Sequence, residues 1–201
     1  ARRRLKFEEF LTIQLMLALI RQDARVDEIG LTFDGTGSLL DRFVDDILPF
    51  TLTSAQERAI VDILEDTTSG YRMNRLLQGD VGSGKTVVAV AAMLLALDNG
   101  YQAAFMAPTE ILAEQHYVSL QEYLAPLSIE IRLLVGGQSR SLREAILKEI
   151  AGGTADVVVG THALIQKSVE FDRLGMAVVD EQHRFGVAQR AEIFAKGERP
   201  H

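Results

Sequence analysis

The sequence predicts an α/β fold in which helices cover both faces of a parallel sheet. From residue 75 onward, short apolar runs alternate with helical segments, and this alternation is typical of parallel sheets. The runs are apolar at nearly every position rather than at every second one, which indicates strands buried on both faces. A glycine-rich stretch between the first run and the helix that follows it adds a candidate phosphate-binding loop.

The composition excludes several other classes of protein. The chain has 201 residues, a net charge of −7 and 47% hydrophobic residues, so we expect one domain with a buried core and a short appendage. The absence of cysteine rules out disulfides, thiolate zinc sites and cysteine nucleophiles. No global basic footprint for nucleic acid exists, although a local groove can be basic on an acidic protein. No signal peptide or membrane span is recognised, which predicts a cytoplasmic location.

The first part of the chain reads as a helical connector over residues 1–47. A helix is expected over residues 4–22, and its centre at 10–20 is apolar on nearly every side, so it should be buried against a partner. Glycines in residues 24–38 indicate a linker. A short amphipathic helix is then expected over residues 39–48.

The sheet domain is expected over residues 48–201. Thr53 is expected to cap a helix over residues 54–66, because a Thr side chain at that position accepts a hydrogen bond from the first turn. The predicted strands cover residues 75–78, 102–107, 131–135, 156–160 and 176–180, and the helices between them cover residues 85–98, 110–124 and 139–151.

Residues 79–86 match the phosphate-loop pattern G-x-x-x-x-G-K-[ST] between a predicted strand and a predicted helix. Glycines let the backbone amides turn toward phosphate oxygens, and the helix N-terminus adds a partial positive charge. Lys85 would supply a full charge to the β- and γ-phosphates, and the Thr86 hydroxyl would bind Mg²⁺. The predicted nucleotide-binding residues of this loop are Gly79, Asp80, Val81, Gly82, Ser83, Gly84, Lys85 and Thr86.

Two carboxylates follow the last predicted strand. Its end places Asp180 and Glu181 at the carboxyl edge of the sheet, where ligands of open α/β sheets bind. Asp180 suits Mg²⁺ binding, and Glu181 suits orienting and deprotonating an attacking water. Such a pair is a weak signal alone, since acidic pairs are common at helix N-termini. It gains weight from the phosphate loop about 95 residues upstream.

Two other nucleotide-binding classes fit less well. G-protein switches need an N-K-x-D motif for base recognition, and the sequence contains none. Matches to their D-x-x-G motif occur at residues 27–30 and 172–175, and neither follows a clean strand. Small-molecule kinases would not require the Asp-Glu-Gln-His string at residues 180–183.

These motifs together resemble the RecG family of branched-DNA helicases in superfamily 2. Residues 180–183 look like a DEAH-type motif II, and the run continues through His-Arg-Phe-Gly-Val as in that family. The transcription-repair coupling translocase shares this run but typically has DEEH, so Gln182 favours RecG. The matching segments stand in family order and cover about 70% of the chain: residues 48–56 (Q motif), 77–86 (motif I), 106–116 (motif Ia), 160–164 (motif Ib or Ic) and 180–190.

The resemblance implies a RecA-like fold, ATP and Mg²⁺ as cofactors, and branched DNA as a partner that is bound largely through its phosphates. Gln56 would read the adenine edge, with Phe50 or Leu52 lining the base. Gln182 and His183 would couple the nucleotide site to the next motif. The implied DNA-binding residues are Pro108, Thr109, Gly160, Thr161 and His162.

The resemblance also implies a fragment of a monomeric parent protein. A wedge domain and a second RecA-like domain with an arginine finger are expected in the family, and residues 48–201 would stop before motif III. We therefore expect the motor domain of an ATP-dependent DNA helicase that remodels stalled forks and Holliday junctions in repair and recombination. The isolated chain is expected to be nearly inactive. Two alternatives stay open: a coupling-type translocase on duplex DNA, and a catalytically inert nucleotide-binding fragment.

Overall fold

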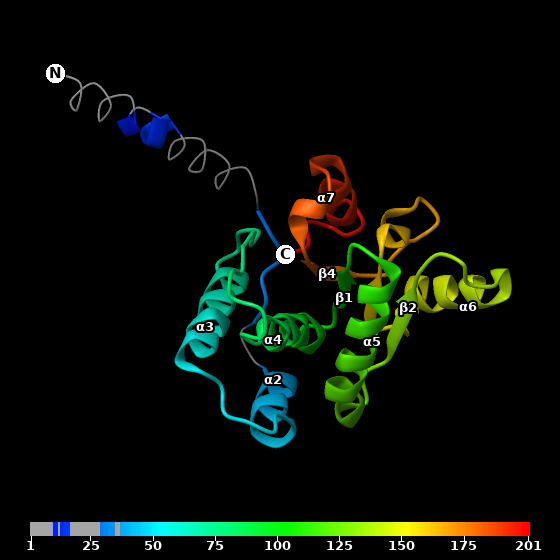
Figure 1. Cartoon of the computed structure of the whole chain (residues 1–201), viewed down its shortest axis with the longest axis horizontal. Coiled ribbons are helices and arrows are strands. Elements are labelled where there is room, and N and C mark those ends of the chain that lie inside the picture. Colours follow the sequence, from blue (N-terminus) through cyan, green and yellow to red (C-terminus); the bar gives the residue numbers. More distant parts are fainter. Residues whose placement is uncertain (1–9, 12, 17–28, 35–36) are drawn as a thin grey trace.

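The computed structural model describes residues 10–11, 13–16, 29–34 and 37–201 (Figure 1). Within these residues, four parallel strands form one sheet in the order β2-β3-β1-β4. The register sets Phe105 of the central strand β1 beside Val159 and Val178 of its two neighbours. The predicted parallel sheet is therefore confirmed. The strands are β1 (Gln102–Met106), β2 (Ile131–Leu134), β3 (Val157–Gly160) and β4 (Leu174–Val179).

Helices cover both faces of this sheet, as the sequence predicts (Figure 1). Successive side chains of a strand point to opposite faces, and β1 divides its residues accordingly between two apolar clusters. Ala103 and Phe105 join the cluster on one face, and Ala104 and Met106 join the cluster on the other. The helices of the first face are α4 (Lys85–Asp98) and α5 (Glu110–Leu124), and those of the second are α6 (Arg140–Ala151) and α7 (Val187–Phe194).

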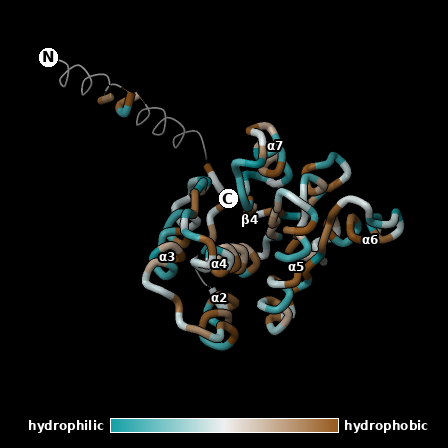
Figure 2. Tube along the Cα trace, in the orientation of Figure 1, coloured by the Kyte–Doolittle hydropathy of each residue, from teal (hydrophilic) through white to brown (hydrophobic). Residues whose placement is uncertain are grey.

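Helix α4 forms the centre of the larger cluster, and Figure 2 colours most of it hydrophobic. It is apolar on every side because it packs against the sheet on one side and against α2 (Ser38–Arg42) and α3 (Ser54–Thr68) on the other. Phe33 and Phe43 are fully buried in the same cluster. The described part of the connector therefore shares the core of the sheet domain, and the boundary at residue 48 stays a prediction.

The connector and the first helix of the sheet domain differ slightly from their predicted bounds. The helix expected over residues 39–48 is α2 followed by a π-helical segment, Phe43–Ile47. Helix α3 begins as predicted, because the Thr53 side chain accepts from Gln56 N while Gln56 Oε1 accepts from Thr53 N at 2.8 Å. Short 3₁₀ segments, which the sequence did not predict, cover Ala125–Leu127, His162–Ile165 and Gln182–Arg184.

The strand predicted over residues 75–78 is wrong. The structure describes these residues as irregular, and Leu76 and Leu77 are exposed. The outer edge of β4 is bonded to His201, since Ala177 N donates to His201 O at 2.8 Å and His201 N donates to Gly175 O at 2.9 Å. Arg75 forms two exposed ion pairs with acidic residues of α3.

The helix predicted over residues 4–22 lies largely outside the described residues. Its described positions, 10–11 and 13–16, are helical. The apolar side chains of Phe10, Ile13 and Met16 are exposed within this chain, and the expected burial against a partner stays a prediction. Across the described ranges, no helix is both long and apolar enough to cross a membrane.

Candidate nucleotide site

The loops that follow the four strands meet at one edge of the sheet, because all four strands run in the same direction. Pro108 and Thr109 follow β1 at the centre, and Thr161 follows β3 beside it. Asp180 follows β4 on the other side of β1, where its N–H extends the pairing by donating to Met106 O at 2.9 Å. This edge therefore gathers the acidic motif and two of the segments that the resemblance assigns to DNA.

The phosphate loop depends on two glycines in the left-handed region. Gly82 and Gly84 have φ values of 81° and 79°, which side chains with a Cβ rarely adopt. Lys85 opens α4, and its Nζ donates to the carbonyl oxygens of Gly79 and Asp80, each at 2.8 Å. The ammonium group therefore lies against the backbone of the loop, within the turn that precedes the helix.

Gln56 joins α3 to the phosphate loop. Its Nε2 donates to Ser83 O at 3.3 Å, while its Oε1 serves the capping box of α3. A Cβ at Gly84 would lie 2.3 Å from Gln56 Nε2, so this approach requires glycine. The residue predicted to read adenine thus fixes the position of the loop in this structure.

Asp180 is held by two hydrogen bonds, one to each carboxylate oxygen. Oδ1 accepts from the N–H of Glu181 at 3.0 Å, and Oδ2 lies 2.9 Å from Nε2 of His116 on α5. The hydrogen bond from His116 is the main cause that lowers the pKa of Asp180, and the positive charge of Lys85 contributes in the same direction. The predicted metal carboxylate and the predicted phosphate lysine are therefore electrostatic neighbours.

Glu181 stands in an unusual backbone conformation. Its φ of 50° and ψ of 46° place a residue with a side chain in the left-handed region, directly after the strand. The carboxylate is half exposed, and its Oε2 lies 3.3 Å from His183 Nε2 and 3.9 Å from Arg184 Nε. The backbone turn separates this carboxylate from that of Asp180, so the two acids face different partners.

Gln182 is joined to α7 by a hydrogen bond from Arg190 Nη1 to its Oε1 at 2.8 Å. Arg190 Nε is buried, and within the part of the chain that the structure describes it has no hydrogen-bond partner. Phe185 is buried in the cluster beneath α7. The residues after the acidic pair therefore anchor the motif to the second face of the sheet.

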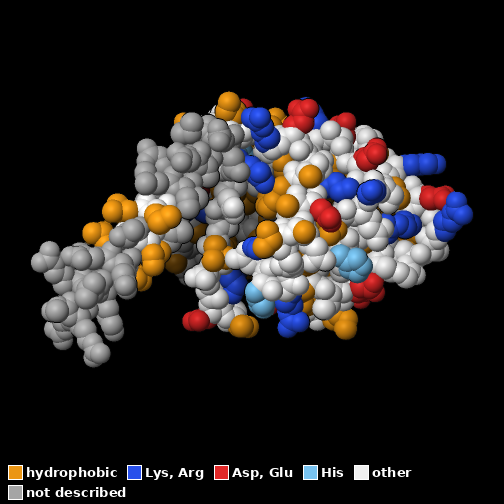
Figure 3. Space-filling view, turned by 90° about the horizontal axis from the view of Figure 1, so that it is seen from above, with side chains coloured by type: hydrophobic (Ala, Val, Ile, Leu, Met, Phe, Trp, Pro, Cys, Tyr) orange, Lys and Arg blue, Asp and Glu red, His pale blue; other side chains and the backbone are white. Residues whose placement is uncertain are grey.

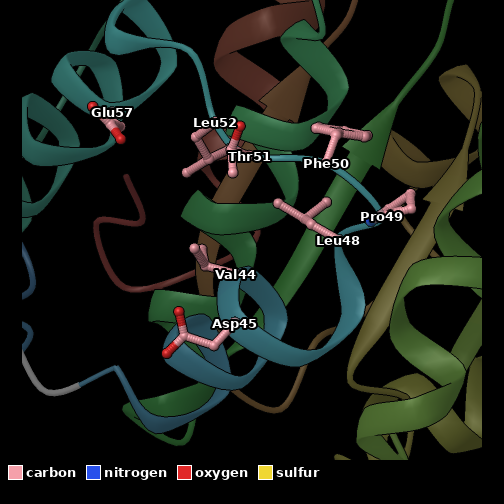
Figure 4. Close-up of a pocket in the computed structure, with 8 residues that line it drawn as sticks. All are labelled: Val44, Asp45, Leu48, Pro49, Phe50, Thr51, Leu52 and Glu57. Carbon is pink, nitrogen blue, oxygen red and sulfur yellow. The ribbon is translucent and has the colours of Figure 1, made fainter.

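The residues predicted to line the base, Phe50 and Leu52, line a pocket of the structure (Figure 4). Phe50 and Leu52 come from the loop before α3, and Gln56 is not among the lining residues. The structure thus brings Gln56 to the phosphate loop, and it places Phe50 and Leu52 in the lining of this pocket. The full lining is Val44, Asp45, Leu48, Pro49, Phe50, Thr51, Leu52 and Glu57.

The predicted DNA-binding residues differ in exposure. Thr109 is exposed as the N-cap of α5, where its side chain accepts from Leu112 N at 3.3 Å. Thr161 is only 1% exposed, and its hydroxyl accepts from Ala163 N at 3.4 Å, whereas His162 is exposed. The Thr161 side chain therefore caps its own turn, and His162 offers the accessible side chain of that loop.

The donor set fits Mg²⁺ by its chemistry. The hydroxyl of Thr86 and the carboxylate of Asp180 are oxygen donors, which this cation prefers, and phosphate oxygens and water usually complete its shell. Throughout the described ranges, no three His, Cys, Asp or Glu side chains gather as a metal cage.

One functional candidate was missed by the sequence reasoning, namely the role of His116. The residue belongs to the segment that resembles motif Ia, yet nothing in that pattern indicates which element it faces. Only the packing of α5 against the sheet brings its ring to Asp180.

One face of the molecule carries charges of both signs. On the face shown in Figure 3, Lys and Arg side chains are interspersed with Asp and Glu side chains. This distribution agrees with the net charge of −7. On this face, contacts with a polyanion would therefore depend on particular side chains and backbone amides.

A parallel sheet covered on both faces, with a phosphate loop and a strand-terminal acidic pair at one edge, defines a phosphate-loop nucleotide-binding domain. The family model described as DEAD/DEAH box helicase matches residues 53–199, and the chain belongs to this family.

The resemblance to the RecG family is confirmed by known relatives. The "ATP-dependent DNA helicase RecG" of a Synechocystis strain is 51% identical over the whole chain, and that of Streptococcus pneumoniae is 50% identical. The chain covers 24% and 29% of these proteins. A solved "Structure of RecG bound to three-way DNA junction" has a TM-score of 0.81 at 47% identity, with 92% of this chain and 25% of that chain covered, which confirms the RecA-like fold. The chain thus spans about a quarter of the length of these relatives.

Proposed function

We propose that this chain is the ATP-binding motor domain of a helicase that remodels branched DNA. One observation supports the proposal most directly: the loop with the phosphate-binding pattern leads into Lys85 at the start of α4, which packs against β1 and β4, and the acidic pair follows β4. The likeness to RecG proteins over the whole chain supports the choice of DNA as the partner. The solved relative bound to a three-way junction supports a branched structure.

The proposed chemistry divides the work among four side chains. Lys85 binds the β- and γ-phosphates through its ammonium group, and Thr86 and Asp180 hold Mg²⁺. The metal, when bound, neutralises negative charge on the phosphate oxygens. Glu181 orients the attacking water and accepts its proton. His183, at 3.3 Å from the Glu181 carboxylate, couples this base to the segment that follows.

Adenine recognition is assigned to the segment before α3. Gln56 has both an acceptor and donors on its amide, which suits a base edge. Its contact with Ser83 O supports a second role, in which the amide that would bind the adenine base also holds the phosphate loop. Phe50, Leu52 and the pocket that they line offer apolar surface near this segment.

DNA is assigned to the loops after β1 and β3. Phosphate oxygens are bound by exposed amides and hydroxyls at helix starts, and such contacts position DNA without reading its sequence. Thr109 and His162 are the exposed side chains at these loops. Pro108, Gly160 and Thr161 shape the turns that present them.

A binding experiment tests the nucleotide part of the proposal. Lys85→Ala removes a charge-assisted contact worth about 1.5–3 kcal/mol, so ATP affinity measured by calorimetry with Mg²⁺ should fall about tenfold or more. Lys167→Ala, an exposed lysine outside the site, is the matched control and should bind ATP like the unchanged chain. ATP should also bind better than GTP, and Gln56→Ala should narrow the difference. Equal ATP affinity in the Lys85 and Lys167 variants would contradict the assignment.

A second experiment tests the DNA part. Binding of a labelled three-way junction should weaken on Thr109→Ala and His162→Ala and should decrease steeply with salt, because phosphate contacts release counterions. Equal binding of a single-stranded oligonucleotide of the same length would count against a branched partner.

A further inference from the structure

The contact between His116 and Asp180 joins a helix directly to the loop that follows a strand. His116 lies on α5, Asp180 lies at the end of β4, and their side chains meet at 2.9 Å from Nε2 to Oδ2. We propose that His116 is a positioning residue that orients the Asp180 carboxylate for Mg²⁺ and so ties α5 to the nucleotide site. This inference rests on the proposed function.

The hydrogen bonds around Asp180 indicate positioning rather than neutralisation. Each of its oxygens accepts one hydrogen bond, Oδ1 from the N–H of Glu181 and Oδ2 from His116. Two donors on opposite oxygens fix the rotation of a carboxylate, and each oxygen keeps a lone pair for a metal or a metal-bound water. Without His116, one end of the group would be free to turn away.

The donor itself is held in place. The His116 ring lies 4.5 Å from the Phe105 ring of β1, and its side chain is only 20% exposed. A donor that is packed against the central strand reaches Asp180 with little freedom to move. Partners of this kind, one step removed from a metal, typically change metal affinity by about 10–100-fold when they are lost.

The same contact connects the metal carboxylate to a loop at the sheet edge. Helix α5 begins after Thr109, and His116 follows seven residues later on the same rigid helix, a rise of about 10 Å. Because His116 is hydrogen-bonded to Asp180, a shift of the carboxylate on metal binding would act directly on α5. The N-terminus of α5 is the place assigned above to DNA phosphate.

Two substitutions separate the hydrogen bond from the packing of the ring. His116→Phe keeps an aromatic ring against Phe105 and removes the donor, whereas His116→Gln loses the ring and keeps an N–H donor at a similar distance from the backbone. ATP affinity is measured by calorimetry for each chain with excess Mg²⁺ and with EDTA. The ratio of the two affinities reports the metal contribution without any turnover.

We expect the unchanged chain to bind ATP more tightly with Mg²⁺ than with EDTA. The ratio of the two affinities should be about tenfold smaller for His116→Phe, and His116→Gln should retain most of it. Affinities in EDTA should agree among the three chains. In an Asp180→Asn background, His116→Phe should have no further effect, because the carboxylate through which it acts is gone.

The outcomes distinguish this inference from the function on which it rests. If the unchanged chain binds ATP no better with Mg²⁺ than with EDTA, the proposed metal site itself fails. If Mg²⁺ raises the ATP affinity of the unchanged chain and of His116→Phe equally, the metal site is supported and the positioning role of His116 is overturned. A loss in His116→Gln with retention in His116→Phe assigns the ring a packing role only and also overturns it.

Discussion

At the scale of single residues, Asp180 and Glu181 are neighbours in sequence but have different partners, so their substitutions should have different effects. Glu181→Gln keeps the shape of the side chain and loses the base, so ATP should still bind while turnover by a longer protein that contains this chain falls about 10²–10⁴-fold. Asp180→Asn removes the carboxylate that His116 and Lys85 stabilise, so the dependence of ATP affinity on Mg²⁺ should weaken instead. Steady-state hydrolysis and calorimetry measure the two effects.

A matched control for these two variants is Glu192→Gln, which changes an acidic residue on α7 without touching the sheet edge. It should hydrolyse ATP at the unchanged rate. Hydrolysis by Glu181→Gln at that same rate would move the general base to another residue.

His201 gives the protein a predictable pH dependence. Its ring is buried, accepts from Met73 N through Nδ1 at 2.9 Å, and faces Leu31 O through Nε2 at 2.9 Å, so one neutral tautomer satisfies both contacts. Burial lowers its pKa below the ordinary value of 6.5. The unfolded chain therefore binds a proton more readily, and the stability that the neutral ring provides is complete above pH 6.5 and is lost as the pH falls toward the lowered pKa.

Urea unfolding measured from neutral to acidic pH checks this expectation. His201→Gln keeps a donor and an acceptor but does not titrate, so its stability should change less over the same range. A variant whose profile follows that of the unchanged chain would show that other groups cause the acid sensitivity.

The sequence could predict the residues whose chemistry is written in a local pattern. Lys85 and the glycines of the loop follow from spacing alone, and the structure places Lys85 at the start of α4 as expected. It could not predict His116, since its partner lies 64 residues away and is reached only through the packed sheet. The burial of Thr161 was also hidden, because a polar residue after a strand can cap its own turn or face solvent.

At the scale of elements, the capping box is the clearest device that starts a helix. Thr53→Ala removes the side-chain acceptor for Gln56 N and should destabilise the chain by about 1 kcal/mol, a typical cost for an N-cap. Chemical denaturation measures it, with Thr51→Ala, an exposed threonine in the preceding loop, as the control. Equal midpoints for the two variants would mean that packing alone holds the start of α3.

Two long helices match their predicted bounds for a physical reason. A helix satisfies its own backbone, so α4 and α5 follow from local sequence and match their predicted bounds. A strand needs a partner, and residues 75–78 are irregular although their run of residues is apolar enough to predict a strand. Helix α7 was missed because it is short, with eight residues after Gly186.

At the scale of the whole molecule, the chain by itself should hydrolyse ATP very slowly, with or without forked DNA. An arginine finger contributes about 10³–10⁵ in rate, and the RecG resemblance implies that it comes from a second RecA-like domain. Arg184 and Arg190 lie near the acidic motif, but they bond to Glu181 and Gln182 of the same segment. Turnover of the purified chain, measured beside its mass in solution, tests this. Robust DNA-stimulated hydrolysis by a monomer would show a complete motor.

The left-handed backbone conformation of Glu181 lowers the stability of the fold at the position where the proposed reaction needs a carboxylate. Asn adopts this conformation more readily than Glu, so Glu181→Asn should relieve backbone strain of about 1 kcal/mol and raise the melting temperature. The exposed ion pairs that it loses contribute little. A laboratory screen that rewards heat resistance alone would therefore enrich replacements at this position, and each gain would remove the proposed base. Calorimetric melting of Glu181→Asn beside Glu181→Gln tests the expectation, and a midpoint no higher for Asn would contradict it.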